Sequence, residues 1–328
     1  MKIAVLGYGS IGKRHVQNLL SIPNTEIVIC TKQKLSDKSF PKKVTIVNSI
    51  NDCLKEKPDA GIVANETSFH ISSAIKFAKA GMDLFVEKPL SNSLSSTKEL
   101  FSLIKNKKLV TQIGCQMRFH KCIIKIKELI LHKKIGKILS VQVECGSFLP
   151  DWHTDENYSK SYAARNDLGG GVVLTCIHEI DYLYWIFGNV SEVFSISGKY
   201  SNLKISADDL SATIIKFQNN VIAELHLDYF QKSPFRSCKI VGTKGVIYWD
   251  SDTNIVKLFD NNKKKWIQKL KWLNYERNNM YKEEMSHFLS CIKKRKSTIN
   301  PIPSDGFVTL NIALAIIKSS KSKKMVKL

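Results

Sequence analysis

Three glycines near the start of the chain have the spacing that a dinucleotide-binding loop requires. Gly7, Gly9 and Gly12 lie between an apolar run, residues 2–6, and an amphipathic stretch, residues 13–20. Strand, glycine turn and helix in this order is the context in which the pattern GxGxxG binds a pyrophosphate. Gly7 allows a tight turn, Gly9 lets the backbone approach the phosphates, and Gly12 lets helix and strand pack closely. The helix start adds N–H groups and the positive end of its dipole, so we expect a dinucleotide here.

The residues after the second predicted strand bear on which dinucleotide is bound. The strand at 26–30 is followed by Thr31-Lys32-Gln33-Lys34, without a carboxylate. An acidic residue at this place would hydrogen-bond the ribose 2′-hydroxyl of NAD, whereas a hydroxyl and two lysines tolerate or attract a 2′-phosphate. We therefore favour NADP over NAD. The alternative is that Lys32 and Lys34 are ordinary solvated charges.

Lys88 is a candidate for chemistry because of its place after a strand. Glu87-Lys88-Pro89 follows the apolar residues 84–86 and so lies at the carboxyl edge of a parallel sheet, where ligands bind in such folds. The proline biases Lys88 to an extended conformation, which directs its ammonium across a cleft. Spacing alone favours the alternative, which is a surface lysine.

A second candidate centre follows three consecutive glycines, residues 169–171. The segment from 172 to Gly188 has helical periodicity, and its polar or aromatic positions at three- and four-residue steps are expected to share one face. These positions are Thr175, His178, Asp181 or Tyr182, and Trp185. A histidine on such a stripe is a candidate acid or base. The alternative is a core histidine with satisfied hydrogen bonds.

An aromatic loop, residues 149–158, precedes this segment. Trp152 and Tyr162 could offer flat faces to a sugar ring, and Arg165 could bind a carboxylate or phosphate in a bidentate manner. The alternative is a surface loop held in place by Trp152.

The elements around these residues divide the chain into two predicted domains. Strands and helices alternate as far as residue 118, which predicts a doubly wound parallel sheet, a Rossmann domain, over 1–118. From 119 to 328 strands predominate between 190 and 258, which predicts an α+β domain with a large, mostly antiparallel open sheet. Two helices, 275–294 and 305–319, end the chain and could pack back on the first domain.

Composition excludes several classes of protein. The 328 residues suffice for two domains, and no apolar run approaches the ~20 residues of a membrane span. The first strand begins at residue 2, which leaves no room for a signal peptide. Eight scattered cysteines without a CxxC pair predict a reducing cytoplasm, no disulfide framework and no metal site.

The formal net charge of +21 suggests nucleic acid as a partner. However, the basic residues are dispersed along the chain, and nearly all are lysines rather than the arginines suited to bidentate contacts. We therefore predict no nucleic-acid partner and no membrane partner.

The motifs taken together resemble the Gfo/Idh/MocA (glucose-fructose oxidoreductase / inositol dehydrogenase) family over essentially the whole chain. The matching segments are 7–15, 65–70, 87–89, 114–119 and 169–181. Residues 149–152 and 178–182 look like the branch found among bacterial surface-sugar biosynthesis enzymes. The resemblance implies a homodimer or homotetramer and hydride transfer between nicotinamide and a carbon bearing a sugar or cyclitol hydroxyl.

The resemblance also implies roles for particular residues. The catalytic lysine and histidine map to Lys88 and His178, which would act on one oxygen as acid, base and charge stabiliser. Residues expected on the cofactor side are Gly7, Gly9, Ser10, Ile11, Gly12, Arg14, Thr31, Lys32, Asn65, Thr67, His70, Glu87, Lys88 and Gln116. Residues expected on the substrate side are Arg118, Trp152, Tyr162, Arg165 and Asp181.

Thr175 departs from the family pattern, which usually has a catalytic aspartate three residues before the histidine. We expect an NAD(P)-dependent oxidoreductase of a sugar or nucleotide-activated sugar, serving surface polysaccharide or amino-sugar biosynthesis. The alternative is a catalytically weakened NAD(P)-binding sensor or scaffold of the same fold.

Overall fold

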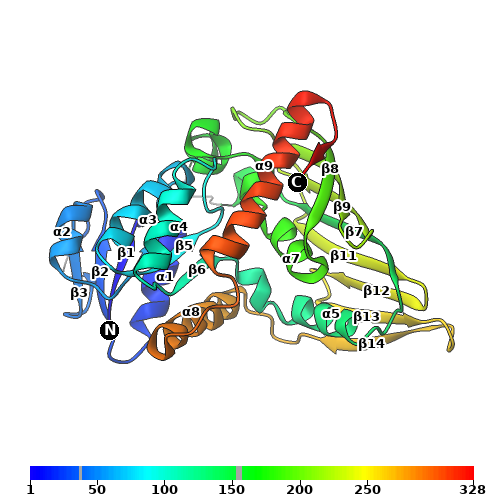
Figure 1. The fold of residues 1–328 in the computed structure, drawn as a ribbon, viewed down its shortest axis with the longest axis horizontal. Helices are drawn as coiled ribbons and strands as arrows, with labels where there is room; N and C mark the ends of the chain where they lie inside the picture. Colours follow the sequence, from blue (N-terminus) through cyan, green and yellow to red (C-terminus); the bar gives the residue numbers. More distant parts are fainter. Residues whose placement is uncertain (37–38, 153–156) are drawn as a thin grey trace. The chain divides into compact units, whose positions relative to one another are not determined.

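The computed structural model describes residues 1–36, 39–152 and 157–328. The chain forms two compact units (Figure 1). The first comprises residues 1–115 and 278–310, and the second comprises residues 116–277 and 311–328. The predicted boundary at residue 118 falls beside the first break, and the C-terminal helices are divided between the units.

The first unit is built on a six-stranded parallel sheet with strand order β3-β2-β1-β4-β5-β6. The strands are β1 Lys2–Leu6, β2 Glu26–Cys30, β3 Val44–Val47, β4 Ala60–Val63, β5 Asp83–Glu87 and β6 Thr111–Gly114. The strand order reverses between β1 and β4, and ligands bind at such a switch point in open α/β sheets. The predicted doubly wound sheet is therefore confirmed, with the glycine loop directly after β1.

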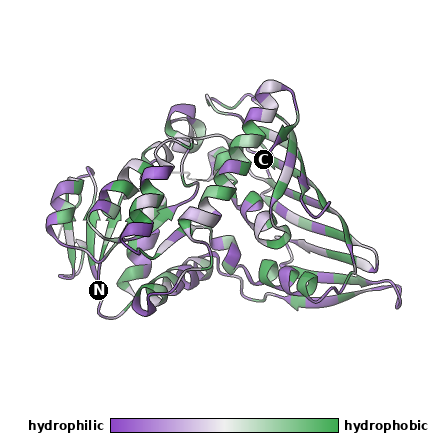
Figure 2. Ribbon diagram, in the orientation of Figure 1, coloured by the Kyte–Doolittle hydropathy of each residue, from purple (hydrophilic) through white to green (hydrophobic). Residues whose placement is uncertain are grey.

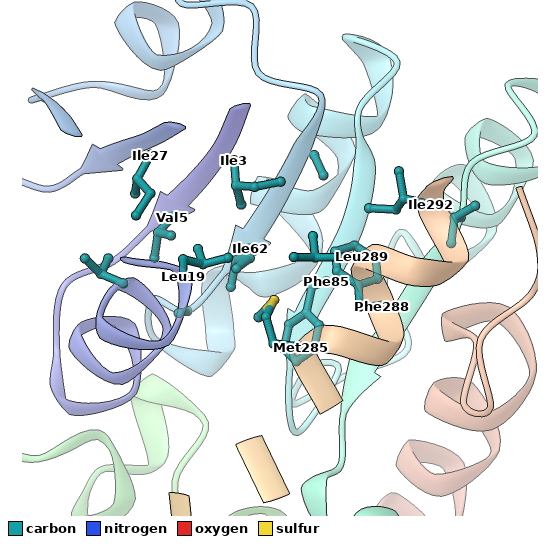
Figure 3. Close-up of a cluster of buried hydrophobic side chains, with 14 of the residues drawn as sticks. Ile3, Val5, Leu19, Ile27, Ile62, Phe85, Met285, Phe288, Leu289 and Ile292 are labelled. Carbon is teal, nitrogen blue, oxygen red and sulfur yellow. The ribbon is translucent and has the colours of Figure 1, made fainter. Parts of the chain in front are cut away.

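Several helices in the described part of the chain belong largely to this unit. They include α1 Ser10–Leu20, α2 Ile50–Lys55, α3 His70–Lys79, α4 Thr97–Asn106, the short η2 Thr67–Phe69, α8 Arg277–Lys294 and the short η8 Ile302–Gly306. The late helix α8 buries Met285 and Phe288 in the same core cluster as Phe85 of β5 and Ile3 of β1 (Figure 3). Phe85 and Phe288 meet edge to face with ring centroids 5.6 Å apart. This apolar contact explains why a segment from the end of the chain returns to the first unit.

The second unit contains a nine-stranded sheet with order β14-β13-β12-β11-β7-β10-β9-β8-β15. Its strands are β7 Ile138–Gly146, β8 Val190–Gly198, β9 Leu210–Phe217, β10 Ile222–Asp228, β11 Phe235–Gly242, β12 Gly245–Asp250, β13 Ile255–Asp260, β14 Lys265–Lys271 and β15 Val326–Lys327. Every neighbouring pair is antiparallel except β7 and β10. The predicted mostly antiparallel sheet is confirmed.

One face of this sheet is covered and the other is open. Along β9 and β10, alternate residues are buried and exposed, and Figure 2 shows hydrophobic and hydrophilic residues alternating along the strands. The helices α5 Lys121–Leu131 and α7 His178–Phe187 pack on the covered face (Figure 1). Such alternation is expected of an antiparallel sheet with one face toward the core. No helix in the described parts of the chain is both long and apolar enough to cross a membrane.

The helix predicted from 172 to Gly188 is broken in the structure. It consists of α6 Val172–Thr175 and α7, separated by a bend at Cys176 and Ile177. Both pieces are buried on nearly all sides, so their apolar pattern continues through the bend and does not reveal it. The prediction that Thr175 and His178 share one helix face is therefore wrong.

Candidate active site

The glycine loop of the first unit has the geometry of a phosphate cradle. Gly7 has a φ of 96°, and a Cβ there would lie 2.6 Å from the carbonyl oxygen of Ala64. A Cβ on Gly12 would collide with the Gly7 carbonyl oxygen. By contrast, nothing lies within 4 Å of a Cβ position on Gly9, which begins α1 without a side-chain cap. The open space over this helix start fits a pyrophosphate, with exposed Ser10 and half-buried Ile11 as the first helical residues.

Arg14 of α1 points to another element of the same unit. Its guanidinium carbon lies 4.6 Å from the centre of the Tyr281 ring on α8. This is a cation–π contact, and it occupies a side chain that was predicted to bind the cofactor. The cofactor role of Arg14 stays a prediction.

The residues after β2 form a small turn. Thr31 is buried, and its hydroxyl accepts the N–H of Gln33 at 3.1 Å, whereas Lys32 is exposed. The Gln33 amide donates to the Tyr8 carbonyl oxygen at 3.3 Å, which ties this turn to the glycine loop. The hydroxyl and lysine discussed for the ribose thus lie beside that loop.

His70 joins the loops that follow β4 and β5. Its Nε2 lies 2.9 Å from the carbonyl oxygen of Asn65, and its Nδ1 lies 2.8 Å from that of Pro89. Burial lowers the pKa of His70. The Asn65 side-chain amide donates to the Ser73 hydroxyl at 3.2 Å. Thr67, which lies between these two residues in the sequence, is also buried. The predicted cofactor residues of this loop are therefore packed together.

Lys88 follows a buried carboxylate that is held at both oxygens. Glu87 ends β5, and its Oε1 lies 2.7 Å from Nε2 of His15. Its Oε2 accepts the backbone N–H of Lys88 at 3.2 Å. A Cβ on Gly114 of β6 would approach this carboxylate to 3.0 Å. The neighbouring strand therefore needs a residue without a side chain at this position.

In the second unit, His178 is the first residue of α7 and is buried. The amide nitrogen of Gln116 donates to its Nε2 at 3.1 Å. An N–H donor at this distance requires that Nε2 carry a lone pair, which is the form of histidine that can accept a proton. Gln116 was predicted on the cofactor side; the contact that the structure gives it is with His178.

Thr175 is buried at the end of α6 and interacts with the phenol of Tyr229. Burial raises the pKa of Tyr229 well above its usual range, although the hydrogen-bonding contact with Thr175 acts against this. The sequence did not single out Tyr229, which follows β10 without any motif around it.

Arg118 and Asp181 were both predicted to contact substrate, and the structure pairs them with each other. Arg118 Nε donates to Asp181 Oδ2 at 2.9 Å, and Nη2 donates to Oδ1 at 2.8 Å. Neither side chain is exposed. The guanidinium carbon of Arg118 also lies 5.7 Å from the centre of the Trp185 ring. Substrate contact by either residue stays a prediction.

Glu179 is a buried charged residue for which the sequence indicated no partner. The carboxylate lies 3.4 Å from Nε of Arg236 on β11, which also donates to Cys145 Sγ at 3.2 Å. No local spacing links residues this far apart in the chain. The only signal in the sequence was that Glu179 directly follows His178. This position does not reveal that Arg236 is its partner.

The predicted aromatic loop is described only in part, because residues 153–156 lie outside the described residues. The Trp152 indole N–H donates to Ser147 at 2.9 Å, and its ring meets that of Tyr229 at 5.4 Å. Tyr162 is half-buried, and exposed Arg165 pairs with Asp167. The contacts of Trp152 agree with the alternative that it holds the loop in place.

The described residues contain no group of three or more histidine, cysteine or acidic side chains arranged to hold a metal ion. A glycine loop at the carboxyl edge of a parallel sheet, with a second α/β unit in the same chain, defines a two-domain dinucleotide-binding protein. The chain belongs to the Gfo/Idh/MocA oxidoreductase family. Residues 1–115 match its NAD-binding Rossmann fold, and residues 127–328 match its C-terminal alpha/beta domain.

Curated relatives are similar over nearly their whole length. The chain is 25% identical to a scyllo-inositol 2-dehydrogenase (NAD(+)) of Bacillus subtilis over 96% of this chain and 92% of the relative. It is 27% identical to a myo-inositol 2-dehydrogenase of Thermotoga maritima over 100% and 98%. A solved levoglucosan dehydrogenase in complex with NADH has a TM-score of 0.88 at 18% identity, covering 100% of this chain and 98% of that chain. This last likeness concerns the fold alone.

Proposed function

We propose that this protein is an NAD(P)-dependent dehydrogenase or reductase acting on the hydroxyl or keto carbon of a sugar or cyclitol. The observation that carries the proposal is the buried His178, whose Nε2 is held as a hydrogen-bond acceptor by the Gln116 amide. The relatives named above act on inositols, which are polyhydroxylated rings of this class.

The reaction divides between a hydride and a proton. When bound, the nicotinamide accepts or supplies the hydride at the carbinol carbon. His178 accepts the hydroxyl proton during oxidation and returns it during reduction, since an imidazole can act both as a base and as an acid. The family resemblance assigns to Lys88 the stabilisation of negative charge on the reacting oxygen.

Two narrower expectations belong to this proposal. Thr31 and Lys32 favour NADP over NAD, although one curated relative is named for NAD(+). The resemblance of residues 149–152 and 178–182 to surface-sugar enzymes favours a nucleotide-activated sugar in polysaccharide or amino-sugar biosynthesis. Both rest on short segments of sequence.

A panel of inositols, free sugars and nucleotide sugars, each tested with NAD and NADP, examines the proposal directly. We expect absorbance at the reduced nicotinamide band to grow with at least one substrate, and His178→Ala to abolish this growth while cofactor binding persists. Equal turnover by His178→Ala and the unmodified protein would remove His178 from the chemistry.

A second candidate function is supported by Thr175. This residue replaces the aspartate usual in the family, and its hydroxyl contacts the phenol of Tyr229. The second candidate is therefore a cofactor-binding sensor or scaffold with weakened catalysis. A gain in turnover in Thr175→Asp would indicate a weakened catalytic group, whereas unchanged turnover would place Thr175 outside the chemistry.

A further inference from the structure

The segment Glu87-Lys88-Pro89 is held on both sides of its lysine by buried histidines. His15 contacts the side chain of Glu87 at 2.7 Å, and His70 contacts the backbone carbonyl of Pro89 at 2.8 Å. The two histidines are 0% and 2% exposed. They come from different helices, α1 and α3. The hydride and proton transfer described above uses neither ring.

We propose that His15 and His70 are positioning residues that hold Lys88 in place for the reaction, one through Glu87 and the other through Pro89. This inference rests on the proposed function of Lys88, but its test includes a measurement that does not depend on turnover.

The contact through His15 is directional. The ring nitrogen Nδ1 of His15 is buried and has no hydrogen-bond partner among the described residues. The proton of a neutral ring therefore belongs on Nε2, which donates to the Glu87 carboxylate. The other carboxylate oxygen accepts the N–H of Lys88 at 3.2 Å. A chain of hydrogen bonds thus runs from His15 through Glu87 to the backbone of Lys88.

The Glu87 carboxylate has little freedom to move from this arrangement. On the side of β6, a Cβ on Gly114 would already lie 3.0 Å from it. The ring of His15 is itself held edge to face against Phe85, with centroids 5.2 Å apart. Apolar side chains would fill the same space at a smaller desolvation cost. The hydrogen bonds offset the cost of burying these polar groups.

The contact through His70 links Lys88 to a second loop. The His70 ring lies between the carbonyl oxygens of Pro89 and Asn65, at 2.8 and 2.9 Å. Both oxygens are acceptors and a neutral ring has one N–H, so the proposal places that proton on Nδ1, where it is donated to Pro89. Asn65 follows β4, and His15 belongs to the helix that begins at the glycine loop. Each of the two loops predicted to contact the cofactor is therefore connected by one histidine to the segment that carries Lys88.

Matched substitutions separate these contacts. A glutamine amide places an N–H near the position of histidine Nε2, and an asparagine amide places one near Nδ1. His15→Gln therefore retains the donor to Glu87, whereas His15→Asn removes it. Conversely, His70→Asn retains the contact with Pro89, whereas His70→Gln removes it. Glu87→Gln weakens the first contact without changing either histidine.

The rate at which an amine-reactive succinimidyl ester modifies Lys88, measured by mass spectrometry against exposed Lys98, is the readout that packing alone would not change. We expect a several-fold faster rate in His15→Asn, His70→Gln and Glu87→Gln, and a rate near that of the unmodified protein in His15→Gln and His70→Asn. We also expect kcat to fall about tenfold or more in the first three, because small misplacements of catalytic groups are costly.

His120→Gln serves as a control, since this buried histidine of the second unit should lower thermal stability without changing Lys88 modification. Equal modification rates within both matched pairs and in Glu87→Gln would overturn the proposal, whatever the turnover. If the rates differ as expected but the unmodified protein oxidises no sugar or cyclitol, the positioning of Lys88 stands and the proposed function fails.

Discussion

Two side-chain contacts bear on the proposed cofactor choice and the proposed proton transfer. We expect Thr31 at the place where an acidic residue would bind the ribose of NAD. Its hydroxyl accepts the backbone N–H of Gln33 within a turn. His178 has its Nε2 held by the amide of Gln116. The first contact can be tested through cofactor preference and the second through kcat, with substitutions that change one functional group each.

Thr31→Asp tests cofactor preference. An aspartate can accept the same N–H of Gln33 and adds a negative charge where a 2′-phosphate would lie. We expect the ratio of kcat/KM for NADPH to that for NADH to fall about tenfold or more, since opposing like charges costs several kcal/mol. Thr31→Asn, which keeps the turn without the charge, should retain the ratio. A preference for NADH in the unmodified protein would contradict the NADP proposal.

Gln116→Met tests whether this residue serves the histidine or the cofactor. The substitution removes the N–H that donates to His178 while keeping a side chain of similar length. We expect kcat to fall roughly five- to tenfold, the value of about one hydrogen bond, with the dissociation constant of the cofactor unchanged. Loss of cofactor affinity with unchanged kcat would instead support the cofactor role predicted from the sequence.

At the scale of elements, one buried ion pair joins two short segments of the second unit. Arg118 belongs to η3, Gln116–Phe119, and Asp181 belongs to α7. Because Gln116 and His178 lie on these same elements, the pair also holds the hydrogen bond at the candidate catalytic histidine.

Arg118→Met should destabilise the second unit by about 3–5 kcal/mol, because it leaves the Asp181 carboxylate buried without its partner. All five tryptophans lie within residues 116–277, so their fluorescence during urea unfolding reports on this unit. The double variant with Asp181→Leu should recover much of the loss. A raised KM for substrate with unchanged stability would instead support the substrate contact predicted for Arg118.

At the scale of the whole molecule, buried histidines make stability depend on pH. His120 packs between Trp249 and Trp272, and burial, aided by the nearby Arg236, lowers its pKa to about 3. The unfolded chain therefore binds more protons than the folded one between about pH 6.5 and 3. Stability is greatest above this range and falls as the pH is lowered through it.

We expect the free energy of unfolding of the second unit to decrease from pH 7 to pH 5, and to decrease less in His120→Gln. The folding equilibrium changes by at most about tenfold per pH unit for each such histidine. Exposed His132→Gln is the control. Equal losses in all three proteins would show that His120 does not contribute to the acid sensitivity.

The open face of the large sheet bears on assembly. Phe194, Ile196 and Ile214 are 39%, 56% and 44% exposed, and they line a groove of about 680 Å³. The resemblance implies a homodimer or homotetramer through such a sheet. We expect Ile196→Lys to reduce the mass measured by light scattering at micromolar concentration, since a buried lysine is costly in an interface. An unchanged mass would place subunit contacts elsewhere.

The sequence alone determined the parts of this protein that depend on neighbouring residues. The apolar run, glycine turn and helix at residues 2–20 are contiguous, and Lys88 directly follows a buried strand, so both could be placed at the carboxyl edge of the parallel sheet. The same adjacency made the family recognisable, and the predominance of strands between residues 190 and 258 predicted the second sheet.

Only the tertiary structure decided which distant side chains meet. Gln116 and His178 are 62 residues apart, Arg118 and Asp181 are 63 apart, and His15 and Glu87 are 72 apart. The periodicity of a sequence reports which faces are apolar, but it contains no information on the partner of a buried polar group. For the same reason, the bend between Thr175 and His178 was invisible in a segment that is buried on nearly all sides. These contacts arise from how strands and helices pack within each unit.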